Sequence, residues 1–122
     1  MRARVVVTEM GVVSPVGIGV SEFWNAALTG QSGISAITSF DPFHKDRYRS
    51  KVAGQVHDFA VERFLDSAHG KCVDRYAQFA IVSAKESLAD SSLQMAKENP
   101  HRVEVIVNAG MGGMVKDERE IT

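Results

Sequence analysis

Arg4-Val5-Val6-Val7-Thr8, close to the start of the chain, is the stretch that decides how the fold is interpreted. Four consecutive β-branched residues favour a strand, and because no polar residues alternate with them, they predict a strand buried on both faces. A strand of this kind is typical of a parallel sheet covered by helices. A second run of the same character occupies residues 103–107 (Val-Glu-Val-Ile-Val). The two runs together predict an α/β fold with a parallel sheet.

The segment after the first run contains several turn residues and then a helix signal. Glycines and a Ser-Pro pair punctuate residues 11–19, so strand or loop is expected to continue to about Val20. Ser21 is then a suitable N-cap, Glu22 falls in the first turn, and Gly30 ends the helix. The apolar face of this predicted helix is formed by Phe23, Trp24, Ala27 and Leu28.

The strongest helix signal lies in the middle of the chain, from about Asp74 to Ala89. Its apolar residues recur at helical spacing and form one stripe, consisting of Val73, Ala77, Ala80, Ile81, Ala84 and Leu88. Between the two helices we expect a loop over residues 31–49, a short strand over residues 51–56 and a helical turn or two around Phe64. The predicted order is strand, helix, strand, helix, strand, which is an α/β alternation.

Composition limits the class of protein. The chain has 122 residues, 14 Lys+Arg against 15 Asp+Glu, and one Cys. Its near-neutral charge argues against nucleic acid or an anionic membrane as a partner. The single Cys forms no internal disulfide, and neither a leader nor a membrane span is expected, so a cytoplasmic location fits best. Two buried strands without a return strand would leave edges unpaired, which predicts that residues 1–122 are part of a larger domain.

The glycines that follow the second run, Gly110-Met111-Gly112-Gly113, raise the question of a phosphate loop. A dinucleotide loop needs a third glycine where Val115 stands, and a P-loop needs Gly-Lys-Ser/Thr. Neither pattern is complete. Tight packing of a strand against a helix is the better interpretation of these glycines, and nucleotide binding stays as an alternative.

A catalytic or metal site is not indicated by the chemistry of the residues alone. Cys72 precedes a helix and follows Lys71, which favours a reactive thiol, but the sequence places no histidine as its base. The histidines have no metal-ligand spacing; they are His44, His57, His69 and His101. We expect no complete catalytic set and no metal site.

Six blocks of the sequence, in order and in register, resemble the opening of the β-ketoacyl-[acyl-carrier-protein] synthases, most closely the KAS II-like elongating enzymes of dissociated fatty-acid synthesis. The resemblance spans all 122 residues but only about the first third of that family's chain. The blocks are Arg4-Val-Val-Val-Thr-Glu-Met-Gly-Val-Val-Ser-Pro-Val-Gly17, Phe23-Trp24 with Gly30-Gln-Ser-Gly-Ile34, Phe40-Asp41, Val52-Ala-Gly-Gln-Val56, Val73-Asp-Arg-Tyr-Ala-Gln-Phe79 and Gly110-Met-Gly-Gly113.

The resemblance implies a fold, a reaction and partners. The fold would be thiolase-like, with residues 1–122 supplying only the N-terminal portion of a layered αβαβα architecture, and the complete enzyme would be a homodimer. The reaction would be a decarboxylating condensation on acyl and malonyl thioesters of acyl carrier protein, with no cofactor and no metal. The family's catalytic Cys and two His lie downstream of the matched part. The resemblance therefore assigns no catalytic residue here, Cys72 included, and implies that the segment alone is inactive.

Two binding positions carry over from the family. The residue between the glycines of the Gly-x-Gly-Gly block, here Met111, would face the acyl tunnel, although a plain core position is an alternative. The basic patch for carrier docking lies ahead of the Asp-Arg-aromatic block, and Lys71 is what remains of it. The sequence departs from the family at Glu9, Glu104 and Asn108, where glycines are usual.

Two other functions stay open. A chain-length-factor-like subunit of a polyketide or fatty-acid synthase would share the fold and lack the nucleophile. A free-standing nucleotide-binding α/β domain is the third possibility. We also expect residues 1–122 expressed alone to be poorly soluble or oligomeric, because the predicted strands need neighbours.

Overall fold

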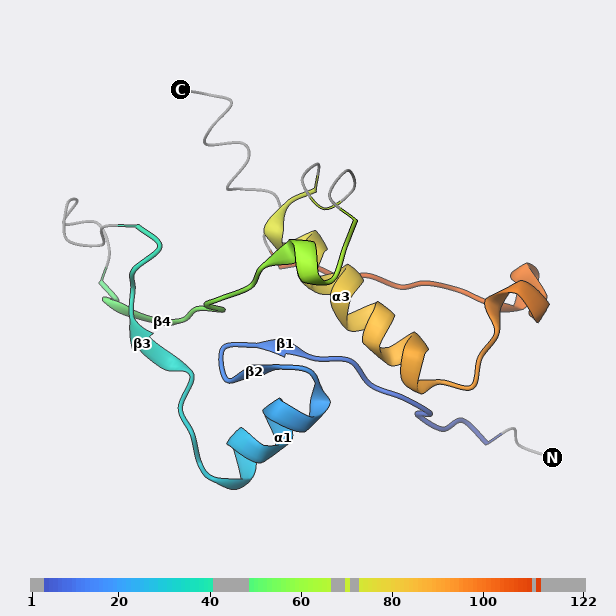
Figure 1. Cartoon of the computed structure of the whole chain (residues 1–122), viewed down its shortest axis with the longest axis horizontal. Coiled ribbons are helices and arrows are strands. Elements are labelled where there is room, and N and C mark those ends of the chain that lie inside the picture. Colours follow the sequence, from blue (N-terminus) through green and yellow to red (C-terminus); the bar gives the residue numbers. More distant parts are fainter. Residues whose placement is uncertain (1–3, 41–48, 67–69, 71–72, 111, 113–122) are drawn as a thin grey trace. The chain divides into compact units, whose positions relative to one another are not determined.

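The computed structural model describes residues 4–40, 49–66, 70, 73–110 and 112 (Figure 1). The chain forms two compact units, Val12–Phe59 and a second unit that joins Met1–Gly11 to Ala60–Thr122. Both helices and strands occur among the described residues, so the α/β class is confirmed. No helix in this part of the chain is both long and apolar enough to span a bilayer.

The unit Val12–Phe59 opens with a small antiparallel hairpin. Its strands are β1 (Val13–Ser14) and β2 (Gly17–Ile18), paired Val13 to Ile18 and Ser14 to Gly17. The Ser14 hydroxyl donates a hydrogen bond to the Gly17 carbonyl at 2.9 Å and accepts one from the Val16 N–H at 3.3 Å. The prediction of strand or loop up to about residue 20 is confirmed, and Ser14 is the last residue of β1 before the turn.

Helix α1 (Val20–Leu28) follows directly, but its N-cap was predicted wrongly. The cap is Gly19, whose φ of 103° is a conformation that glycine adopts at little cost, and Ser21 lies inside the helix. Glu22 is in the first turn as predicted, and its carboxylate accepts the Ile18 N–H at 3.0 Å. Gly30, at φ 67°, follows the C-cap and ends the helix as predicted.

Strands β3 (Ile34–Ala36) and β4 (Val52–Gly54) form a second antiparallel pair, in which Ser35 stands opposite Ala53. Strand β4 was predicted, whereas residues 34–36 were expected to be loop. This error is understandable because Ile-Ser-Ala carries little strand signal of its own and depends on its partner. A Cβ added at Gly33 would lie 2.7 Å from the Pro15 side chain, so the hairpin turn packs closely on the start of β3.

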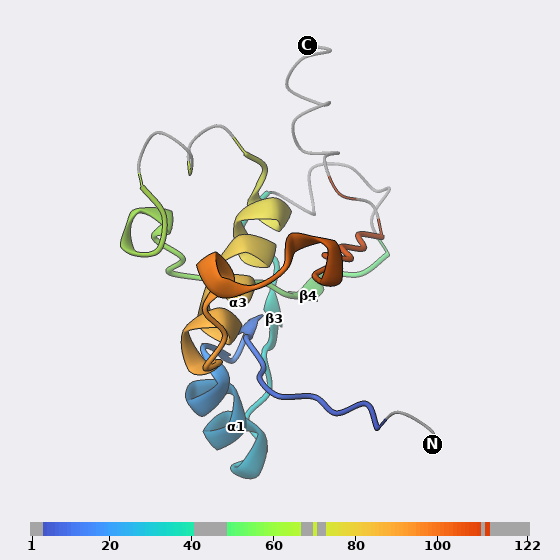
Figure 2. The same ribbon diagram turned by 90° about the vertical axis from the view of Figure 1, so that its right-hand side faces the viewer.

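The second unit is built around α3 (Arg75–Asp90), close to its predicted range. The 3₁₀ turn η1 (Val61–Arg63) lies beside α3 (Figures 1 and 2), where the Lys85 ammonium donates to the Phe64 carbonyl at 2.7 Å. Two further turns, η2 (Met95–Lys97) and η3 (Pro100–Arg102), follow the helix. The predicted helical turn before α3 is therefore confirmed.

The buried face of α3 differs from the predicted stripe. Val82 is buried, whereas Ile81 and Leu88 are exposed. Periodicity predicts that a helix has an apolar face, but the elements packed against the helix decide which face is covered. The stripe predicts the helix correctly, but the buried residue of α3 is Val82, which the stripe does not include.

The two β-branched runs do not form strands, which corrects the central sequence prediction. Val5 is 93% exposed and Ile106 is 86% exposed, and both runs are extended without a strand partner in the described part of the chain. A β-strand forms when a neighbouring strand pairs with its backbone N–H and C=O groups. In an exposed extended segment without such a neighbour, water forms hydrogen bonds with these groups instead. Within the described residues the paired strands are antiparallel, so the expected parallel sheet is not present there.

Candidate functional site

Lys71 and Met111, the two predicted binding residues, lie outside the described residues, as does Cys72. Their neighbours in the chain are described. Gly70 and Val73 precede and follow residues 71–72, and Gly112 follows residue 111. These neighbours lie at the first turns of α3, so the candidate site is built from that end of the helix.

The side chain of Gln78 joins α3 to the segment that contains Lys71. Its Nε2 group donates to the Gly70 carbonyl at 2.6 Å and to the Val73 carbonyl at 3.1 Å. Both amide hydrogens of the side chain are thus used on the same short segment. Gly70 is itself buried, and a Cβ added there would lie 3.1 Å from the Val61 side chain. The backbone is therefore fixed on both sides of residues 71–72.

The ring of Tyr76 lies against Gly112. A Cβ added at Gly112 would lie 2.7 Å from Cε2 and 2.8 Å from Cζ of that ring, so the ring would have to shift to admit it. This contact favours the packing interpretation of the glycine block, because close approach to a helix is what a missing Cβ allows. Nothing lies within 4 Å of a Cβ added at Gly110, so the close approach is specific to Gly112.

A second glycine approaches the same helix. A Cβ added at Gly11 would lie only 1.8 Å from the Ser83 carbonyl oxygen. Ser83 is seven residues after Tyr76, which places the two on one face of α3, about 10 Å apart along its axis. Gly11 follows the first β-branched run and Gly112 follows the second. The ends of both runs therefore contact one face of one helix.

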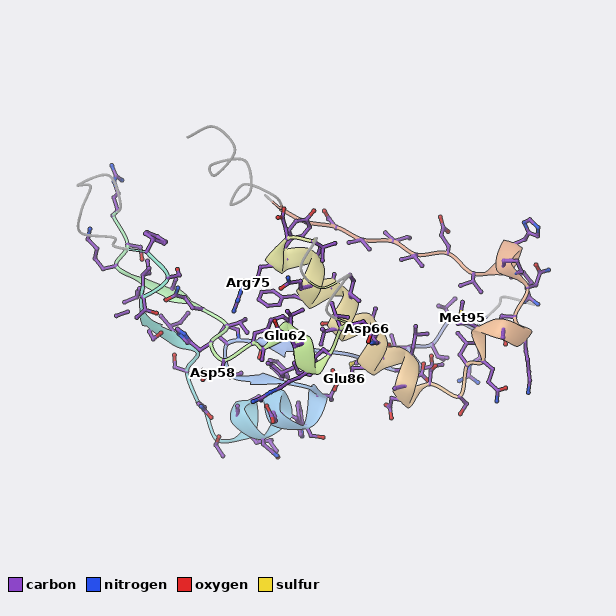
Figure 3. All side chains as sticks on the ribbon, turned by 45° about the horizontal axis from the view of Figure 1, so that its top comes forward. Asp58, Glu62, Asp66, Arg75, Glu86 and Met95 are labelled. Atoms are coloured by element: carbon purple, nitrogen blue, oxygen red, sulfur yellow. The ribbon has the colours of Figure 1, made fainter. Side chains whose placement is uncertain are left out.

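Arg75 is the first residue of α3 and follows the N-cap residue Asp74 (Figure 3). Its guanidinium carbon lies 5.2 Å from the centroid of the Phe79 ring, one turn further along the helix, which is a cation–π distance. Arg75 adds a positive charge close in sequence to Lys71. Asp74 precedes Arg75, so residues 71–75 carry two positive charges and one negative charge.

Sequence reasoning named neither Tyr76 nor Gln78 as site residues. Both belong to the block Val73-Asp-Arg-Tyr-Ala-Gln-Phe79, which was recognised only as a family signature. Within the described residues, no cluster of His, Cys, Asp and Glu is arranged to hold a metal ion. The described arrangement positions backbone segments and places the Arg75 guanidinium over the Phe79 ring.

Comparison with known proteins places the chain in a family. The model of the β-ketoacyl synthase N-terminal domain matches residues 2–121. The 3-oxoacyl-[acyl-carrier-protein] synthase 2 of Coxiella burnetii is 40% identical over 113 residues, which are 93% of this chain and 27% of the relative. The enzyme of the same name from Staphylococcus aureus strain COL is 37% identical over 91% of this chain and 26% of its own length.

A third relative belongs to another kind of pathway. The putative polyketide beta-ketoacyl synthase 1 of Streptomyces cyaneus is 38% identical over 120 residues, which are 98% of this chain and 28% of the relative. The chain thus spans about a quarter of the length of the curated relatives it matches. On the match over residues 2–121, the chain belongs to the β-ketoacyl synthase family and corresponds to its N-terminal domain.

Proposed function

We propose that residues 1–122 are the N-terminal part of a β-ketoacyl-[acyl-carrier-protein] synthase that elongates acyl chains in fatty-acid biosynthesis. The proposal rests mainly on the family match over residues 2–121. The 40% identity to a 3-oxoacyl-[acyl-carrier-protein] synthase 2 supports it. The enzyme would be an acyltransferase. A cysteine thiolate takes the acyl group from its carrier, and the carbanion formed by decarboxylation of malonyl carrier attacks that thioester. The family's Cys and two His lie downstream, so this segment alone is inactive.

The fold of the complete protein would be thiolase-like, with residues 1–122 as a partial N-terminal domain of the αβαβα layers. In it, residues 4–8 and 103–107 would be neighbouring parallel strands covered by α3. The contacts of Gly11 and Gly112 with one face of α3 support this arrangement, because they bring the ends of both runs to the same helix. The exposed valines of both runs would then be covered by further layers. The complete enzyme would be a cytoplasmic homodimer.

This segment would contribute two binding functions. Met111 would line the acyl tunnel, where a flexible thioether suits a wall that adapts to a hydrocarbon chain. Lys71 would attract the acidic carrier protein that delivers acyl and malonyl thioesters. The hydrogen bonds from Gln78 to Gly70 and Val73 support the second role, since they fix the backbone on both sides of the lysine.

A second candidate function is a non-catalytic, chain-length-factor-like subunit of a polyketide or fatty-acid synthase. The 38% identity to the Streptomyces cyaneus polyketide protein is the observation that supports this second candidate. The two candidates differ in whether a Cys stands at the next strand-to-helix elbow, followed by two His. Reading the gene beyond codon 122 decides between them. The family match leaves a free-standing nucleotide-binding domain without support.

A chimeric synthase tests the proposed function. The 113 matched residues of this chain would replace their counterpart in the Coxiella burnetii enzyme, and the product of malonyl carrier and acyl carrier would be identified by mass spectrometry. We expect condensing activity within about tenfold of the parent, a loss of no more than about 1.4 kcal/mol of transition-state stabilisation. A chimera carrying the matched Staphylococcus aureus segment is the positive control. A folded, dimeric chimera without condensing activity would contradict the proposal.

The isolated chain should behave differently from the chimera. Because Val5 and Ile106 are largely exposed in unpaired extended runs, we expect the 122-residue chain to self-associate at micromolar concentration. Sedimentation velocity measures this directly. A matched variant, Val6→Lys with Ile106→Lys, should shift the distribution towards monomer because charges on unpaired extended segments oppose pairing. A sharply melting wild-type monomer would contradict the expectation.

A further inference from the structure

We draw no further inference here: the strongest candidate, the exposed apolar face of α1 that contains Trp24 and Leu28, carries nothing because nothing among the described residues shows what covers it.

Discussion

Replacing Gly11 by alanine is expected to destabilise the chimeric synthase by about 3 kcal/mol, the upper part of the range for overpacking. The added Cβ would lie 1.8 Å from the Ser83 carbonyl oxygen. Ser83 lies inside α3, so its carbonyl belongs to the helix backbone and cannot rotate away as a flexible side chain would. To remove the overlap between the added Cβ and this carbonyl, the segment before Gly11 must move away from the helix. Urea denaturation of the chimera measures the loss.

Gly110→Ala is the matched control for this prediction. The same chemical change at Gly110 meets nothing within 4 Å, so its cost should be within about 0.5 kcal/mol, as for ordinary surface substitutions. If the two alanine variants lost equal stability, the close approach of Gly11 to α3 would not exist in the folded protein. The proposed neighbouring strands would then lose one of their two supporting contacts.

Met111→Phe is expected to shorten the acyl chains that the chimera accepts. A rigid ring in the tunnel wall excludes the terminal methylenes of the longest substrate, and kcat/KM for that substrate should fall by about tenfold to a hundredfold. Short acyl carriers should be affected little. The measurement is the product distribution from a mixture of acyl carriers of different length.

Met111→Leu serves as the conservative comparison, because it keeps the volume close to that of methionine and should keep the distribution. An unchanged chain-length profile in Met111→Phe would remove Met111 from the tunnel. A uniform loss at all lengths would point to the core position that the sequence left open as the alternative.

Local signals account for the elements that were predicted well. The apolar periodicity of residues 74–89 predicts α3, and Glu22 and Gly30 mark the beginning and end of α1. These features depend on residues within one or two turns of each other. The N-cap of α1 was missed because the structure uses the backbone freedom of Gly19 instead of the hydroxyl of Ser21.

Non-local pairing accounts for what was predicted wrongly. Residues 4–8 and 103–107 have the composition of buried strands, but composition cannot supply the neighbours whose hydrogen bonds make a strand. Strand β3 shows the converse, since its weak sequence signal is compensated by pairing with β4. The same distinction between local and non-local information applies to the residues of the candidate site. Family resemblance named Lys71 and Met111, whereas the contacts of Gln78 and Tyr76 required the three-dimensional structure.

The bonds that Gln78 makes with Gly70 and Val73 join neutral groups, an amide with two peptide carbonyls. Added salt screens charges and leaves such bonds nearly unaffected. Attraction between Lys71 and an acidic carrier would weaken as ionic strength rises, while the anchorage of the surrounding backbone would persist. The segment would thus remain ready to receive its partner under conditions in which the partner arrives more slowly.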